Sequence, residues 1–278
     1  MTEQVVAWFT DPFAYEFMQR SLLVTVVASV VCALLSCWLV LIGWSLLGDA
    51  VSHAVLPGVV LSYVVGAPFA LGALVFGLGA VVLIGTVRDT TRLKEDAVIG
   101  VIFTTLFALG LVLISVVPSQ VDLSHILFGN LLGVTDAEIW QVVVLGVLTA
   151  AVLLLKRRDL TLLAFDPVHA HAIGLSPRRL RALLLAALAV TVVVAIQAVG
   201  VILVVAMVIT PGATAFLLTD RISRMFVIAP AVAAVCALAG MYASYHLDTS
   251  SAGMVVLAQG VAFATAYAVT TPARARRA

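Results

Sequence analysis

Long apolar stretches follow one another along the whole chain, and short segments between them carry most of the charged residues. A helix rises about 1.5 Å per residue and the hydrocarbon core of a bilayer is about 30 Å thick, so roughly 20 apolar residues cross it once. The pattern therefore predicts an all-α bundle with about nine membrane-spanning helices. Their expected ranges are Ser21–Ile42, Val51–Val65, Pro68–Val87, Ala97–Val117, Ile139–Leu155, Leu180–Val199, Val201–Leu218, Phe226–Tyr245 and Ala252–Thr270.

Three pieces of this pattern are irregular. If Val51–Val65 is re-entrant, the number of spans falls to about eight and the N-terminus changes side. Ile126–Val134 is too short to cross and is predicted to be re-entrant or interfacial. The segment Trp8–Met18 mixes aromatic with acidic residues, so residues 1–20 are predicted to form an interfacial N-terminal helix.

The composition excludes a soluble enzyme. Hydrophobic residues make up 63% of the 278 residues and charged residues 10%, whereas soluble domains have roughly 45–50% and about 25%. No stretch is polar enough for a separate soluble domain, so residues 1–278 are expected to form a single transmembrane domain. There is no GxxxxGK[ST] loop, which excludes a built-in ATPase, and the net charge of +1 gives no reason to expect a nucleic-acid partner.

The basic residues predict the orientation in the cell membrane. If about nine helices alternate, with the N-terminus outside and the C-terminus in the cytoplasm, five clusters of Lys and Arg all become cytoplasmic. The turns that would then lie outside, near Ala67, Ser119, Ala198 and Leu247, carry no Lys or Arg. The five clusters are Arg88, Arg92 and Lys94; Lys156, Arg157 and Arg158; Arg178, Arg179 and Arg181; Arg221 and Arg224; and Arg274, Arg276 and Arg277.

The longest polar interval predicts a short cytoplasmic helix within residues 159–177. Asp166 is placed to cap its N-terminus, Pro167 suits its first turn, and Gly174 suits its end. A short helix held between basic anchors is suited to docking into the groove of a partner, and the alternative is an ordinary interfacial helix. Its expected small apolar face consists of Ala170, Ile173 and Gly174.

Ionisable side chains at membrane depth are costly and are candidates for function. In the sequence GDAVSHAVLPG, Asp49 and His53 are four residues apart and share one face of a helix. A carboxylate and an imidazole on one face form a partial site for a divalent cation such as Mn²⁺, Zn²⁺ or Fe²⁺. Two ligands are too few for tight binding, which suits a route that the cation must also leave. The alternative is structural, with Asp49 capping the helix and His53 bonding a neighbouring carbonyl group.

Proline and glycine interrupt two of the expected spans. Pro57 and Gly58 are predicted to break or bend the helix that carries Asp49 in mid-membrane, where transporter sites tend to lie. In the sequence ITPGAT, Pro211 and Gly212 predict a kink and free backbone carbonyl groups. Either position could act as a hinge, and the second could equally be a packing notch.

A second polar cluster lies at the predicted outer mouth of the last two spans. His246 and Asp248, in the sequence YHLDTSS, could attract or pass a cation there. The alternative is a solvated turn in which Asp248 caps the last helix.

Two long motifs, LLGDAVSHAVLPGVVLSYVVG and VGVILVVAMVITPGATAFLLTDRISRM, carry a specific resemblance. The chain resembles the integral-membrane permease subunits of bacterial ABC importers for manganese, zinc and iron. The resemblance runs nearly end to end. It is extended by DPFAYEFMQRSL, EDAVIGVIFTTLFALGLVLIS, ILFGNLLGV, AFDPVHAHAIGL and SYHLDTSSAGMVVL.

The resemblance implies a transport complex. Two copies of the permease would form the pathway, two separate cytoplasmic ATPase subunits would drive it, and an extracytoplasmic binding protein would deliver the cation. Asp49 and His53 would line the route, and the loop Phe165–Ser176 would be the coupling helix that sits in the ATPase. No cofactor is expected to be tightly bound, since the divalent cation is cargo.

The chain departs from the family pattern at Ile42, Gly43 and Trp44, where basic residues are usual, and at Gly212, where Ala is common. These departures leave other cargoes open. The leading expectation is alternating access, in which closure of the ATPase dimer moves the coupling helix and passes a cation by Asp49 and His53. The alternatives are a permease for a metal chelate or haem, with a wider route, or a secondary transporter that works alone.

Overall fold

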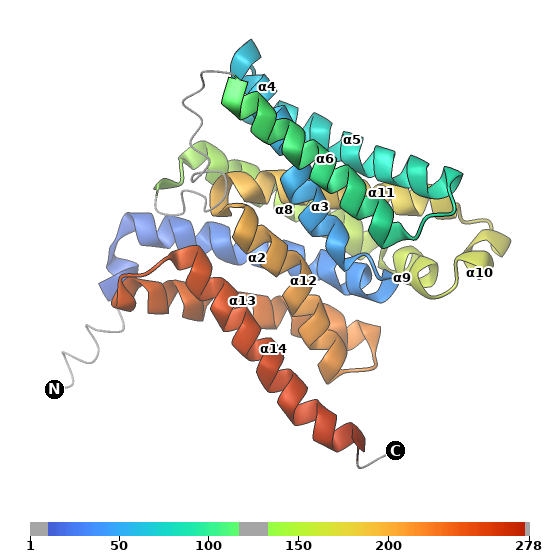
Figure 1. The fold of residues 1–278 in the computed structure, drawn as a ribbon. Coiled ribbons are helices and arrows are strands. Elements are labelled where there is room, and N and C mark those ends of the chain that lie inside the picture. The colour runs from blue at the N-terminus through green and yellow to red at the C-terminus, as the bar shows by residue number, and fades with distance from the viewer. Residues whose placement is uncertain (1–10, 117–132, 276–278) are drawn as a thin grey trace.

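The structure, a computed structural model, describes residues 11–116 and 133–275, with the side chains of the last helix described as far as residue 271. These ranges contain helices and no strand (Figure 1). The helices are α2 (Glu16–Ile42), α3 (Ser45–Ala54), α4 (Leu56–Val65), α5 (Phe69–Thr90), α6 (Glu95–Val116), α8 (Asp136–Leu155), α9 (Arg157–Phe165), α10 (Pro167–Ala172), α11 (Pro177–Val199), α12 (Val201–Leu218), α13 (Ile222–Leu247) and α14 (Ser251–Ala275).

Nine candidate membrane spans lie within the described residues, as predicted. Helices α3 and α4 together form one of them, with 21 residues from Ser45 to Val65. The predicted piece Val51–Val65 is therefore part of a full-length span and not a short re-entrant segment. The sequence pattern understated this span because its first turns contain Ser45, Asp49 and Ser52 among the apolar residues.

Local capping explains why α8 begins three residues before the predicted Ile139. The backbone N–H of Glu138 donates to Thr135 Oγ1 at 3.3 Å, and the backbone N–H of Thr135 donates to Glu138 Oε2 at 2.8 Å. This reciprocal pair is a capping box, which satisfies two backbone donors at a helix start. Polar residues therefore extend the helix beyond its apolar part.

The N-terminal prediction is only partly open to comparison, because residues 1–10 lie outside the described residues. Residues 11–14 are helical, and Tyr15 forms a bend before α2. Residues 16–20, which were expected in the interfacial helix, instead form the first turn of the span α2. Most of the predicted segment Ile126–Val134, and the turn near Ser119, also lie outside the described residues.

Helix α2 occupies the centre of the bundle and packs against α8, α11, α12 and α13 (Figure 1). Its hydroxyl groups are buried, and two of them donate to the preceding turn: Ser21 Oγ to the carbonyl of Phe17 and Thr25 Oγ1 to the carbonyl of Ser21, each at 2.7 Å. Bonds of this kind satisfy a buried hydroxyl where water is absent. Helices α6, α8 and α14 are much less buried, so their outer faces remain for lipid or for a partner.

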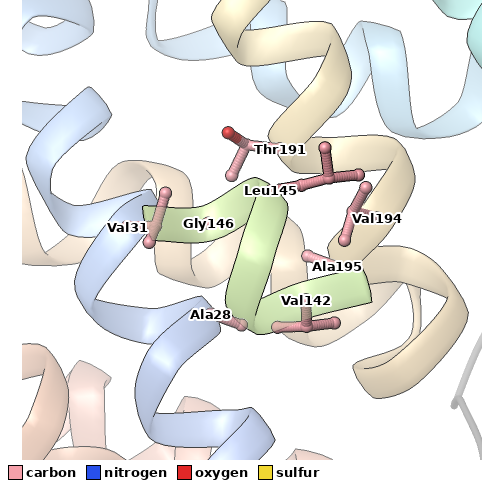
Figure 2. Close-up of a pocket in the computed structure, with 8 residues that line it drawn as sticks. All are labelled: Ala28, Val31, Val142, Leu145, Gly146, Thr191, Val194 and Ala195. Carbon is pink, nitrogen blue, oxygen red and sulfur yellow. The ribbon is translucent and has the colours of Figure 1, made fainter. Parts of the chain in front are cut away.

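The packing around α2 is nearly closed. Where α2, α8 and α11 meet, the remaining cavity has a volume of about 10 Å³, which is room for about one water molecule. Figure 2 shows that Thr191 supplies the only hydroxyl group among the labelled side chains around it. The three helices therefore pack closely against one another at this place.

Arginines gather at one end of the bundle, and Arg20 at the other end is paired with carboxylates. Arg88, Arg178 and Arg181 line one groove at the end that also holds α9 and α10, on the right of Figure 1. At the opposite end Arg20 forms ion pairs with Glu16 at 2.5 Å and with Asp136 at 2.9 Å. The positive-inside rule assigns the arginine-rich end to the cytoplasm.

Candidate functional site

Asp49 and His53 lie one turn apart on α3 and contact each other. His53 Nε2 is 3.3 Å from Asp49 Oδ1, and the side chains are 23% and 33% exposed, respectively. Asp49 stands in the second turn of α3, which begins at Ser45, so the alternative in which it caps this helix is wrong. The two side chains offer an oxygen and a nitrogen at one place.

Two aromatic rings from α6 hold the imidazole of His53. The ring centre of Phe103 lies 5.3 Å from that of His53, and the ring centre of Phe107 lies 5.0 Å away in an edge-on arrangement. The phenylalanines are four residues apart and so face α3 from one side of α6. The sequence does not indicate their role, because their i, i+4 spacing within an apolar span has no feature that separates them from ordinary core residues.

The opposite side of α3 is pressed against the bundle. A methyl group built on Gly48 would lie 2.7 Å from Val208 Cγ1 of α12, and Ser52 Oγ donates to the carbonyl of Gly48 at 2.8 Å. Leu46, by contrast, is 51% exposed and precedes Asp49 and His53 by three and seven residues. Leu46, Asp49 and His53 therefore form a stripe, called here the open stripe of α3, that this chain leaves partly uncovered.

The span breaks directly after the candidate site. Helix α3 ends at Ala54, Val55 is a turn, and α4 begins at Leu56 with Pro57 in its first turn. Because Pro57 has no N–H, it cannot donate the bond that would continue α3 into α4. The break predicted at Pro57 and Gly58 is therefore present, whereas a hinge motion at this position stays a prediction.

The second proline lies inside a continuous helix. Helix α12 runs through Pro211, and the hydroxyl of Ser36 from α2 bonds to it on both sides of the proline. Ser36 Oγ donates to the carbonyl of Ile209 at 3.1 Å and accepts from the N–H of Gly212 at 3.0 Å. A methyl group on Gly212 would lie 2.6 Å from the backbone oxygen of Ser36. Gly212 is therefore a packing notch, and its role as a hinge stays a prediction.

The cytoplasmic segment contains two helices. Asp166 caps α10 by accepting from the N–H of His169 at 2.8 Å, Pro167 is in the first turn, and Gly174 has a left-handed φ of +87°. These three predicted features are present. The part from residue 159 to 165 was expected only as polar loop, but it belongs to α9, because Leu160 and Leu163 are buried against the bundle.

Ala170 does not belong to the exposed apolar face that was predicted for this segment. Ala170 is fully buried, so it cannot contribute to a docking surface, whereas Ile173 is 57% exposed. Phe165 and Val168 are 66% and 78% exposed. Phe165, Val168 and Ile173 are therefore the large apolar side chains that the segment presents. The sequence did not show that these three side chains are exposed and Ala170 is buried, because this depends on how α9 and α10 pack against each other on either side of Asp166.

The structure gives the predicted outer cluster little support as a metal site. The ring centre of His246 lies 4.5 Å from that of Tyr242, and Asp248 is exposed in a left-handed conformation at the end of α13. Ser250, not Asp248, accepts from the N–H of Gly253 at the start of α14. Among the described residues, no group of three or more His, Cys, Asp or Glu side chains could hold a metal ion.

Comparisons with known proteins place the chain in a family. Residues 14–270 match the ABC 3 transport family. This chain belongs to that family. It is therefore a membrane subunit of an ABC transporter complex, a multi-pass protein of the cell membrane that leaves ATP hydrolysis to a separate subunit.

Individual relatives agree with this assignment over nearly their whole length. The chain is 50% identical, over 92% of its length and 86% of the relative, to the manganese transport system membrane protein MntB of Synechocystis sp.. It is 47% identical, with the same coverage, to the chelated iron transport system membrane protein YfeD of Yersinia pestis. The solved structure of PsaBC from Streptococcus pneumoniae in complex with Fab matches with a TM-score of 0.85 and 34% identity, covering 95% of both chains.

The structure also gives an account of one departure from the family pattern. Trp44 is buried, and the guanidinium of Arg88 lies 5.7 Å from the centre of its indole ring. Before α3 this chain has Ile42, Gly43 and Trp44 where basic residues are usual. Arg88 of α5 places a positive charge beside this position instead. A cation over an aromatic face is attracted to it, so Arg88 anchors this end of α3 from a neighbouring helix.

Proposed function

We propose that this permease passes manganese or iron, as a divalent cation, through the membrane along a route that includes Asp49 and His53. The observation that carries the proposal is the contact of these two side chains on the open stripe of α3. The names of the relatives at 50% and 47% identity give manganese and chelated iron as the cargoes of those proteins. A site within a membrane span that supplies only two ligands binds a cation weakly, which is suited to passage and not to tight binding.

The chemistry of the pair supports a free cation over a bulky complex. Carboxylate oxygen and imidazole nitrogen are ligands that Mn²⁺ and Fe²⁺ accept, and the three cysteines, which would select softer metals, are buried elsewhere in α2 and α13. Phe103 and Phe107 fill the space beside His53 with aromatic carbon. A haem or a large chelate would need that space.

The open stripe supports a paired permease. Each chain supplies one carboxylate and one imidazole, and after Ser45 at its start α3 is covered by its own bundle except along Leu46, Asp49 and His53. A second copy placed against this stripe would bring a second pair and raise the number of ligands to four. The same contact would cover Leu46, which is otherwise exposed.

The cytoplasmic end supports coupling to two ATPase subunits. Helix α10 is fixed by its cap at Asp166 and by the turn at Gly174. The exposed apolar side chains around it are Phe165 at the end of α9, Val168 in α10 and Ile173 directly after α10. Movement of an ATPase bound to these side chains would pass through α9 and α11 into the bundle and change access to Asp49 and His53. An extracytoplasmic binding protein would deliver the cation at the opposite end.

Uptake by the complete complex tests the site. The permease, reconstituted in liposomes with its ATPase and binding protein, is assayed with radioactive Mn²⁺ and Fe²⁺ for wild type, Asp49→Asn, His53→Gln and the control Asp89→Asn. Because the loss of even an outer partner of a metal ligand costs roughly 10- to 100-fold in affinity, both site variants are expected to reduce uptake by more than about tenfold. Asp89 is exposed and lies in the cytoplasmic end of α5, so its variant should transport normally.

Three results would count against this proposal. Unchanged uptake in Asp49→Asn and His53→Gln, with normal assembly, would remove the pair from the route. Uptake of an iron chelate but not of the free cations would assign the cargo of the chelate transporters. Uptake by the permease without its ATPase would indicate a secondary transporter.

A further inference from the structure

A groove between α5 and α11 opens on the outside of the bundle at its cytoplasmic end. It has a volume of about 460 Å³ and is separate from the candidate cation site, which lies beside α6. Its walls change in character along its length. Leu78 and Val82 of α5 and Leu185 of α11 line one part. The other part is lined by four charged side chains, Arg88, Asp89, Arg178 and Arg181.

Arg178 and Arg181 differ from the other charged residues of the groove in that neither forms an ion pair with a described residue. No carboxylate among the described residues lies within 4 Å of the guanidinium of Arg178 or Arg181. Arg88, which also lines the groove, differs, because it pairs with Asp89 and Glu95, each at 3.1 Å. Arg178 and Arg181 are three residues apart and so share a face of α11.

The dimensions and the direction of the groove match one leaflet of the bilayer. From Leu78 to Asp89, α5 rises about 16 Å, at about 1.5 Å per residue. Half of the hydrocarbon core is about 15 Å. In the orientation that the positive-inside rule predicts, the charged end would lie at the level of the cytoplasmic headgroups and the apolar end near the middle of the membrane.

We propose that this groove binds one anionic phospholipid of the cytoplasmic leaflet. The headgroup phosphate would pair with Arg178 and Arg181, and an acyl chain would lie along Leu78, Val82 and Leu185. Basic pockets between membrane helices on the cytoplasmic side suit such headgroups, and the cytoplasmic leaflet attracts basic segments through its negative surface potential. A zwitterionic lipid would place its own cation beside the arginines and would bind less well.

Gly85 provides a way to test the groove without changing its charge. It lines the groove, and a methyl group built on it would meet no atom within 4 Å, so the space above it is open. Gly79, six residues earlier on α5, also has open space above it but does not line the groove. Gly85→Leu should therefore fill the binding space, and Gly79→Leu is the matched control.

Native mass spectrometry of the permease–ATPase complex tests the proposal. The complex is purified from nanodiscs that contain equal amounts of phosphatidylglycerol and phosphatidylcholine, and the lipid retained per permease is measured. Wild type is expected to retain phosphatidylglycerol in preference. Since a base near the membrane surface contributes about fivefold to the binding of an anionic lipid, Arg178→Gln/Arg181→Gln should reduce this retention by about 25-fold.

The remaining variants decide between a groove and a merely basic surface. Gly85→Leu should lose the retained phosphatidylglycerol, whereas Gly79→Leu and the charge-matched Arg92→Gln/Lys94→Gln should keep it. Equal retention of both lipids by wild type, or an unchanged preference in Gly85→Leu, would overturn the proposal. If Arg178→Gln/Arg181→Gln loses the ATPase but keeps the lipid, the arginines bind protein instead, and the proposal is also overturned.

Discussion

Gly58 of α4 and Gly72 of α5 approach each other so closely that neither position has room for a side chain. A methyl group on Gly58 would lie 2.6 Å from the carbonyl carbon of Gly72, and one on Gly72 would lie 2.8 Å from the carbonyl carbon of Gly58. The obstacle at each position is backbone, which cannot move away as a side-chain end can. This contact holds the second half of the broken span against α5.

Replacing either glycine should therefore destabilise the permease. Gly72→Ala is expected to cost about 1–3 kcal/mol, the usual range for overpacking, because α4 and α5 must separate. Thermal unfolding of the purified complex in detergent measures the effect. Gly79→Ala is the control, since its methyl group would meet no atom within 4 Å, and an equal loss of stability in both variants would contradict the contact.

The contact of Ser36 with α12 predicts a second loss. Ser36→Ala removes one hydroxyl that donates to the carbonyl of Ile209 and accepts from the N–H of Gly212, and each buried hydrogen bond contributes about 1 kcal/mol. Gly212→Ala should be worse, because its methyl group meets the backbone of α2. The double variant should not restore stability, since the backbone oxygen of Ser36 remains. If the double variant had wild-type stability, the methyl group added at Gly212 would clash only with the hydroxyl group of Ser36 and not with the backbone of α2.

The two rings beside His53 predict an effect on transport without loss of a ligand. Phe103→Leu and Phe107→Leu keep an apolar residue but remove the ring contacts that orient the imidazole. We expect the concentration of Mn²⁺ that gives half-maximal uptake to rise toward the lower end of the roughly 10- to 100-fold range seen for outer partners of metal ligands. The maximal rate and the amount of assembled complex should change little. Phe76→Leu, on α5, provides a comparison in the same bundle.

The turn at Gly174 predicts uncoupling of the ATPase. Its φ of +87° is strained for any other residue, and its N–H donates to the carbonyl of His171 at 3.0 Å. Gly174→Val should displace the end of α10, so that hydrolysis of ATP by the complex no longer rises with the loaded binding protein. Gly79→Ala, at a glycine without positive φ and with open space around it, should behave as wild type. Normal stimulation in Gly174→Val would argue against coupling through α10.

The sequence was most informative where a single helix determines the outcome. The i, i+4 spacing of Asp49 and His53 placed the two side chains in contact, and Pro57 marked the break after them, because both effects are local to one segment. Thr135 and Glu138 carry an equally local signal for the start of α8, since a threonine followed three residues later by a glutamate is the pattern of a capping box.

Contacts between helices could not be predicted in this way. The rings of Phe103 and Phe107, the insertion of Ser36 at Pro211 and the burial of Ala170 each depend on how two segments meet. In a chain that is 63% hydrophobic, nearly every helix face is apolar, so the pattern does not indicate which face meets which neighbour. The groove between α5 and α11 was missed for the same reason.

Helix α3 has only ten residues, and a helix of that length has little stability of its own. Its position is fixed by Val208 of α12 behind it, by Phe103 and Phe107 of α6 beside it, and by Arg88 at its cytoplasmic start. The distance between Asp49 and His53 is set within α3, but their exposure is set by those neighbours. A small relative displacement of α6 and α12 would therefore change the affinity for a cation without any change in the ligands themselves.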